Sequence, residues 1–284
     1  MTVVRTVLLP VDFSDDNPLI LAFARGLSAL GVRHVILGHV VEASGLEGPV
    51  IARKVDEARD RLLLEYASEL SAAGLSVEVQ VVTGDPVEEL SALAAETHVD
   101  AAVYGSHAKS VAGQLFVGSV SDRLMREATI PHLVVRFDLL RNHADPASLL
   151  RRFGEKLVLA TDFSLSAAHA FTFTVELPAG AVKHVTLLHA IDPALTGEKL
   201  RRVEEGAEFH LKNLQAMCTQ KKMPSSVSIR VGTPVHAVLD EIGERRASGV
   251  IVGTRGRNAV QEMLMGSVSM TLMRQASCPV LIVP

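Results

Sequence analysis

Short apolar runs alternate with longer segments of helical periodicity along the whole chain. In the first half, the runs are mostly continuous and rich in β-branched residues, and they cover Thr6–Val11, Val35–Val41, Ser76–Val82, Ala101–Tyr104 and Leu133–Val135. Runs of this kind are typical of parallel strands that are buried on both faces. Between the second and third runs, apolar positions recur at helical spacing from Val55 to Leu70. The alternation predicts an α/β fold, with an open five-stranded parallel sheet and helices on both of its faces.

The pattern occurs twice. The segment Leu9–Ser14 reappears as Leu159–Ser164, and Gly84–Val87 reappears as Gly232–Val235. A period this long predicts two tandem domains rather than a solenoid of short repeats. We place the domains at residues 1–137 and 155–284, with a linker at 138–154. Because crossovers between parallel strands are right-handed, the strand order expected in each domain is 3-2-1-4-5.

Hydrophobic residues make up 48% of the chain and charged residues 21%, which is enough apolar surface to support folded domains. The formal net charge of -4, the 4% aromatic content and the lack of Trp argue against a nucleic-acid partner. No apolar run approaches the roughly 20 residues of a membrane helix, so no membrane span is expected. Cys218 and Cys278 are too few for a disulfide framework and lack metal-ligand spacing. A reducing, cytoplasmic location is therefore expected.

A glycine-bearing loop follows the fourth apolar run of the second half. Ligands of open parallel sheets bind at the carboxyl ends of the strands, where this loop is expected to lie. Glycine lets the backbone approach an anion, and the start of the next helix offers free amides and a partial positive charge. The candidate phosphate ligands are Gly253, Arg255, Gly256, Arg257, Gly266 and Ser267. A structural alternative is that the glycines only permit a tight turn and Ser267 only caps its own helix.

Three features resemble the universal stress protein family in a tandem form, over nearly the whole chain. They are the strand ending Pro10–Ser14, the pair His39-Val40, and the loop pattern G-x-x-G, nine residues, G-[ST]. The resemblance implies domains that bind an adenine nucleotide, ATP or AMP, with or without Mg²⁺. It assigns adenosine contacts in the second half to Ala160, Thr161, Asp162 and Ala190. The equivalent nucleotide-binding residues in the first half are Pro10, Val11, Asp12, Val40, Gly105, Lys109, Gly118 and Ser119.

The two copies of the loop differ at one glycine. The first copy has Ala108 where the second has Gly256. If this position has a positive φ, an alanine there costs roughly 1 kcal/mol in conformation. We therefore expect adenine nucleotide to bind the second domain more tightly than the first.

Enzyme signatures are absent from the sequence, which has no G-x-S-x-G, H-E-x-x-H or Walker loop. Between Gly253 and Ser267 the only carboxylate is Glu262, whereas efficient phosphoryl transfer needs a metal-anchoring carboxylate and a positioned water. We assign no catalytic residue and no metal site, and we expect His39 and His189 to be hydrogen-bonded structural residues.

The resemblance therefore favours a stress-related regulatory protein, a sensor or switch with an unidentified protein partner. The two domains are expected to pair within the chain through their last strands, with homodimerisation as a further option. Two alternatives stay open. One is a weak ATPase or other nucleotide-using enzyme, and the other is a binder of a non-nucleotide ligand such as a lipid.

Overall fold

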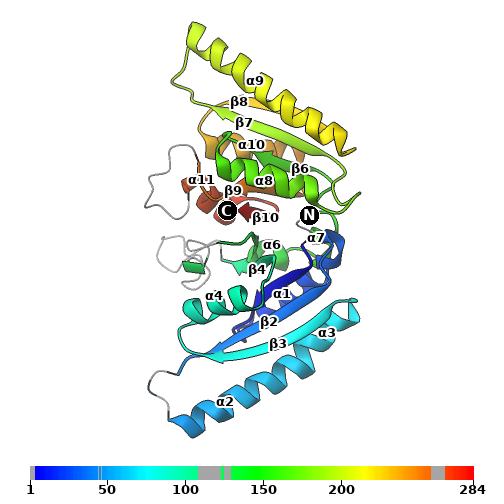
Figure 1. The fold of residues 1–284 in the computed structure, drawn as a ribbon, viewed down its shortest axis with the longest axis vertical. Helices are drawn as coiled ribbons and strands as arrows, with labels where there is room; N and C mark the ends of the chain where they lie inside the picture. The colour runs from blue at the N-terminus through cyan, green and yellow to red at the C-terminus, as the bar shows by residue number, and fades with distance from the viewer. Residues whose placement is uncertain (1–3, 44, 46, 108–122, 125–128, 257–265) are drawn as a thin grey trace. The chain divides into compact units, whose positions relative to one another are not determined.

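The computed structural model of this protein describes residues 4–43, 45, 47–107, 123–124, 129–256 and 266–284. The contacts between these residues divide the chain into two compact units, one ending at Arg151 and the other beginning at Arg152 (Figure 1). Residues 4–151 are called the first unit here, and residues 152–284 the second unit.

The first unit contains an open, fully parallel sheet. Its strands are β1 Thr6–Pro10, β2 His34–Val41, β3 Ser76–Thr83, β4 Ala101–Ser106 and β5 His132–Arg136. Its helices are α1 Asn17–Ala24, the 3-10 helix η1 Leu27–Leu30, α2 Gly48–Arg61, the π-helical η2 Leu62–Ala67, α3 Ser68–Ala72, α4 Pro86–Glu96, α6 Phe137–Arg141 and α7 Ala147–Arg151. The strand order is β3-β2-β1-β4-β5. Leu8 of β1 pairs with Ile36 of β2 and with Ala102 of β4, so β1 lies at the centre.

The second unit repeats this arrangement. Its strands are β6 Leu157–Ala160, β7 Val185–Ile191, β8 Ser225–Val231, β9 Gly249–Gly253 and β10 Val280–Val283. Its helices are α8 Leu165–Glu176, α9 Gly197–Gln220, α10 Pro234–Arg245 and α11 Ser267–Gln275. The strands follow in the order β8-β7-β6-β9-β10, and Leu159 of β6 pairs with Leu187 of β7 and Ile251 of β9. The predicted strand order is therefore confirmed in both units.

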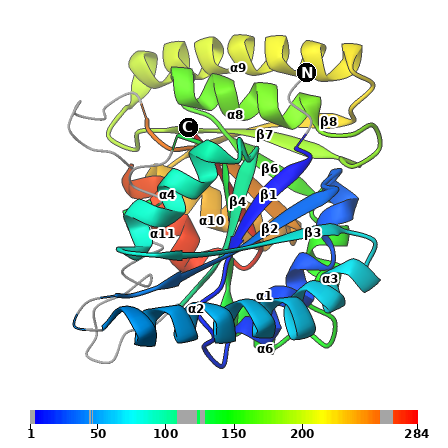
Figure 2. The same cartoon turned by 60° about the horizontal axis from the view of Figure 1, so that its bottom comes forward.

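Helices cover both faces of each sheet, as the sequence predicts. Helices α2 and α4 lie on opposite faces of the first sheet, and α9 and α10 on opposite faces of the second (Figures 1 and 2). Helix α4 begins at Pro86, where the missing proline N–H costs no helical hydrogen bond. The side chain of Asp85 caps this helix by accepting a hydrogen bond from Val87 N at 2.9 Å. Strand residues such as Leu9 and Leu37 are fully buried between the two helical layers.

Two segments differ in detail from the sequence-based expectation. The helix predicted around residues 55–70 is interrupted by the π-helical turn η2, whereas its counterpart α9 is continuous. The segment 138–154, expected to be a linker, carries most of α6 and all of α7. Both helices pack against α1 of the first unit, because Leu140 and Leu150 are buried apolar residues at their inner faces.

Candidate functional site

In each unit, the first strand, β1 or β6, is followed by a turn that contains an aspartate at the carboxyl edge of the sheet. In the first unit, Asp12 Oδ1 accepts a hydrogen bond from Ser14 N at 3.0 Å, and Phe13 between them has a φ of 60°. The second unit repeats both features at Asp162 and Phe163, whose φ is 61°. A left-handed non-glycine residue costs on the order of 1 kcal/mol. In both units this turn places the aspartate carboxylate at the edge where ligands of parallel sheets bind.

A histidine from the second strand braces each turn. His39 Nδ1 donates to Val11 O at 2.8 Å, and His189 Nδ1 donates to Thr161 O at 2.7 Å. The His39 ring also packs on Phe13, with ring centroids 4.4 Å apart. Burial lowers the pKa of His39, so its ring is neutral at physiological pH and one nitrogen remains an acceptor. Both histidines therefore make the hydrogen bond that the sequence predicts.

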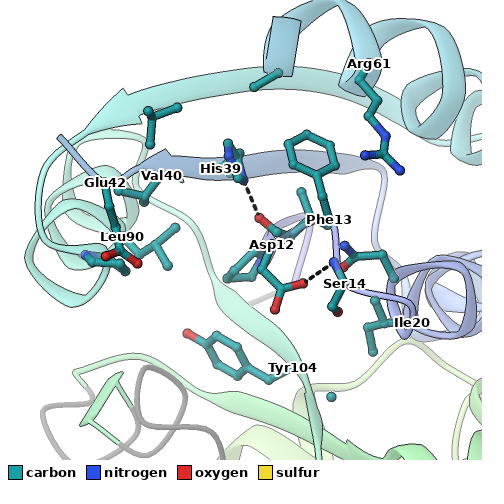
Figure 3. Close-up of a pocket in the computed structure, with 18 of the residues that line it drawn as sticks. Asp12, Phe13, Ser14, Ile20, His39, Val40, Glu42, Arg61, Leu90 and Tyr104 are labelled. Carbon is teal, nitrogen blue, oxygen red and sulfur yellow. Dashed lines mark hydrogen bonds between the residues drawn. The ribbon is translucent and has the colours of Figure 1, made fainter. Parts of the chain in front are cut away.

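A cavity of about 690 Å³ opens at the carboxyl edge of the first sheet (Figure 3). It is lined by the ends of β1, β2 and β4, and so it brings together Asp12, Val40 and Gly105. Pro10 and Val11 also line it, which places all of the described first-unit candidates in one cavity. Four lining residues that the sequence did not suggest are Asn17, Glu42, Tyr104 and Phe137.

Tyr104 faces Asp12 across this cavity (Figure 3). Its ring is nearly buried and stacks on His132, with centroids 5.3 Å apart. Burial raises the pKa of the Tyr104 phenol, so the hydroxyl stays protonated and available as a donor. The sequence did carry a signal for this residue, since Tyr104 is the last residue of the fourth apolar run and directly precedes Gly105.

Phe137, the first residue of α6, covers the start of the loop in the first unit. A Cβ built on Gly105 would overlap the Phe137 ring, so the ring lies directly on the glycine backbone. His107 packs beside it, with ring centroids 4.7 Å apart, and its Nε2 lies 3.4 Å from Asp16 Oδ2. The other first-unit loop candidates, Lys109, Gly118 and Ser119, lie outside the described residues.

In the second unit, both ends of the loop meet beside the strand-end aspartate. A Cβ built on Gly256 would lie 2.8 Å from Asp162 Oδ2, so glycine and carboxylate are in close contact. Gly266 N donates to Thr254 O at 2.7 Å, which closes the loop at its base. Arg255 is exposed between them. Arg257 lies outside the described residues.

The structure corrects the reason for glycine at this position. The described glycines with a positive φ do not include Gly256, so the condition of a left-handed conformation is not met. A side chain at this position would instead displace the Asp162 carboxylate. At Gly253, the close neighbours are Ser166 and Ala167 at the start of α8, so this glycine permits helix packing.

The simple capping role considered for Ser267 is also wrong. The N-cap of α11 is Gly266, and Ser267 is the first helical residue, with an exposed position. The four predicted adenosine contacts lie at the ends of β6 and β7: Ala160, Thr161, Asp162 and Ala190. Because β6 and β7 are neighbours in the sheet, these residues and the loop share one edge.

Neither a metal centre nor a membrane-spanning helix is found in the part of the chain that the structure describes. There, no three histidine, cysteine, aspartate or glutamate side chains gather in a way that could hold a metal ion. Within the same described ranges, no helix combines the length and the apolar character needed to cross a membrane.

Fold and site together define a duplicated α/β protein in which two strand-end aspartates and a glycine-bearing loop lie at the ligand-binding edges of the sheets. Comparison with protein families identifies the family. The model of the universal stress protein family matches residues 4–136 and again 154–284, so the chain belongs to this family.

Some relatives match about half of this chain, and others match nearly all of it. The universal stress protein MJ0577 of Methanocaldococcus jannaschii is 26% identical over 153 residues, covering 46% of this chain and 94% of its own. A universal stress protein of Mycolicibacterium smegmatis is 24% identical and covers 98% of this chain and 96% of its own. The crystal structure of a universal stress protein from Archaeoglobus fulgidus has the same fold, with a TM-score of 0.75, 23% identity, and coverage of 99% and 98%.

Proposed function

We propose that this protein is a stress-related regulatory protein that binds an adenine nucleotide, ATP or AMP, chiefly in the second unit. The observation that supports this most directly is the contact between Gly256 and Asp162, which joins the loop to the strand-end carboxylate. A ligand at this edge would meet the carboxylate and the loop amides side by side. Asp162 would accept hydrogen bonds from adenosine, as the family resemblance implies.

The phosphate end of the proposed site has the properties that anions require. Helix α11 begins here, and its free N–H groups and partial positive charge favour phosphate. Arg255 is exposed at the same place and can add direct charge. The proposed phosphate contacts are Gly253, Arg255, Gly256, Arg257, Gly266 and Ser267. The described residues include no acidic cluster for Mg²⁺, so we assign that ion no protein ligand.

We propose a sensor or switch rather than an efficient enzyme. Donors that neutralise phosphate in the ground state do not by themselves accelerate hydrolysis, because they bind substrate and transition state equally. By sequence, the loop from Gly253 to Ser267 contributes one carboxylate, Glu262. We expect ATP hydrolysis far below the typical enzyme rate of about 10 per second. Several turnovers per second, abolished in Glu262→Gln, would instead establish the ATPase alternative.

The nucleotide assignment is tested first without any assumption about the ligand. The purified chain is denatured, and the released small molecules are identified by mass spectrometry. We then titrate ATP and AMP into the full chain and into two matched variants, Asp162→Asn and Asp12→Asn. Loss of nucleotide binding in Asp162→Asn, with smaller change in Asp12→Asn, supports the proposal. Undiminished binding in Asp162→Asn would remove this edge of the second unit as the site.

A further inference from the structure

We infer that His210 is a pH-dependent positioning residue for the ligand site of the second unit, and that it acts through Phe163 on the Asp162 carboxylate. The inference rests on the proposed nucleotide binding and adds to it a way in which pH regulates that site. It is carried by the aromatic contacts of Phe163 and by a difference between the two copies of one of these contacts.

The Phe163 ring connects helix α9 to the turn that contains Asp162. Phe163 directly follows Asp162, and its ring contacts two histidines. The centroid distance is 4.5 Å to His189 of β7 and 5.1 Å to His210 of α9. The exposed His210 ring also contacts Phe209, with centroids 5.7 Å apart. A change of charge at His210 therefore acts on two aromatic rings, and one of them belongs to the residue next to Asp162.

The first unit has a permanent cation in the corresponding contact. Arg61, the last residue of α2, places its guanidinium carbon 4.7 Å from the centroid of Phe13, which directly follows Asp12 (Figure 3). A cation near the face of an aromatic ring is attracted by the ring electrons. Arginine stays charged at any physiological pH, whereas histidine changes its charge between about pH 5 and 8. The contact is thus always cationic in the first unit, but it depends on pH in the second.

Charged groups on α9 itself do not mask this contact. The charged residues nearest to His210 along the helix are Glu208 and Lys212, and they form an ion pair with each other at 2.6 Å. The side chains one helical turn away from His210 carry no charge: Gly206, Ala207, Asn213 and Leu214. The described part of α9 therefore leaves the aromatic rings as the immediate neighbours of the His210 ring.

The elements packed against α9 add few other charges. The helix packs on β7 and β8, whose titratable or charged residues are His189 and Arg230, respectively. Arg230 forms ion pairs with two glutamates of α10, on the opposite face of the sheet from α9 (Figures 1 and 2). The turn after β6 contributes Asp162, which is the group that the contact positions. Protonation of His210 therefore strengthens mainly its attraction to the Phe163 ring.

The backbone of Phe163 explains how this attraction changes ligand affinity. Its φ of 61° is in the left-handed region, which is unfavourable for a bulky residue. The turn therefore competes with less strained conformations, in which Asp162 is not aligned. A ligand binds the fraction of molecules in which the turn is formed, so its apparent affinity scales with that fraction. A stronger contact at low pH raises the fraction, and the ligand binds more tightly.

Calorimetric titration of adenosine and ATP into the full chain at pH 6 and pH 8 tests the inference. For the binding that Asp162→Asn removes, the wild type should bind adenosine roughly two- to fivefold more tightly at pH 6 than at pH 8. His210→Gln should bind at both pH values as weakly as the wild type at pH 8. His210→Arg, which copies the first unit, should bind tightly at both. The matched control is His143→Gln, at an exposed histidine of the first unit, and it should keep the wild-type pH dependence.

Equal pH dependence in the wild type and in His210→Gln would overturn the inference. A pH dependence for ATP without one for adenosine would also overturn it, because His210 would then attract the phosphates directly. Failure of the proposed function appears separately, as binding that is insensitive to Asp162→Asn. Thermal melts without ligand test the contact even in that case. The wild type should melt above His210→Gln by a margin that is roughly 1–3 °C larger at pH 6 than at pH 8, and an equal margin would contradict the inference.

Discussion

Gly256→Ala is the sharpest perturbation of the proposed nucleotide site. The new Cβ would lie 2.8 Å from Asp162 Oδ2 and 3.9 Å from its Cγ. A carbon cannot stay this close to a carboxylate oxygen, so the carboxylate has to move. The other oxygen of the same carboxylate accepts the Ser164 N–H at 3.0 Å, so any rotation also weakens that hydrogen bond.

The size of the effect follows from these contacts. Weakening one hydrogen bond to a partly exposed carboxylate costs about 1 kcal/mol of folding free energy. The displaced carboxylate also loses its alignment with adenosine, and a further loss of about 1 kcal/mol in binding corresponds to a roughly fivefold rise in the Kd for ATP. The expected change is therefore moderate and appears in both stability and affinity.

Calorimetric titration with ATP and urea denaturation measure the two effects. Gly206→Ala is the matched control, because Gly206 is exposed within α9 and a Cβ there meets nothing within 4 Å. That substitution should raise the free energy of unfolding by roughly 0.5–1 kcal/mol, as helix propensity predicts, and leave ATP affinity unchanged. Wild-type ATP affinity in Gly256→Ala would refute the argument that the contact between Gly256 and Asp162 forms part of the nucleotide site.

Two further predictions concern buried ionisable groups. His132 is 3% exposed, neither ring nitrogen has a partner in the described residues, and burial lowers its pKa to about 4. The neutral His132 ring is compatible with its buried site above the ordinary histidine pKa of about 6.5, and the stability that this provides is lost as the pH falls toward 4. Between pH 7 and pH 5, the free energy of unfolding of the wild type should therefore fall by about 2 kcal/mol more than that of His132→Phe. Urea denaturation at the two pH values measures this difference. Glu241 is fully buried and accepts from Ser228 at 3.1 Å and from Arg230 and Arg245. Glu241→Gln should reduce the free energy of unfolding by about 2 kcal/mol. The control is Glu244→Gln, at the exposed glutamate that also pairs with Arg230, and it should reduce the free energy of unfolding far less. Equal effects of the two substitutions would contradict the role of burial.

Much of the architecture could be predicted because it depends on local patterns and on duplication. Continuous apolar runs predicted the strands to within a residue or two, as at β1 and β5. Right-handed crossovers then left one strand order, which both units have. The strand-end aspartates were also predictable, since the residue that follows a parallel strand lies at the ligand edge in any such sheet.

Contacts between residues that are distant in the sequence had to come from the tertiary structure. The approach of Asp162 to Gly256 depends on how the turn after β6 meets the loop after β9, and no local propensity encodes that distance. For this reason the sequence argument could consider a left-handed backbone as the reason for Gly256, a conformation that the structure does not have.

The first unit shows the same division between pattern and packing. The sequence alone determined that Asp12, Val40 and Gly105 would share an edge, because parallel strands align their carboxyl ends. It did not place Phe137 on Gly105, since that contact requires α6 to fold back against α1, through side chains whose burial is decided by the whole unit. Periodicity fixes which face of an element is buried, whereas the partner that covers it is selected by packing in three dimensions.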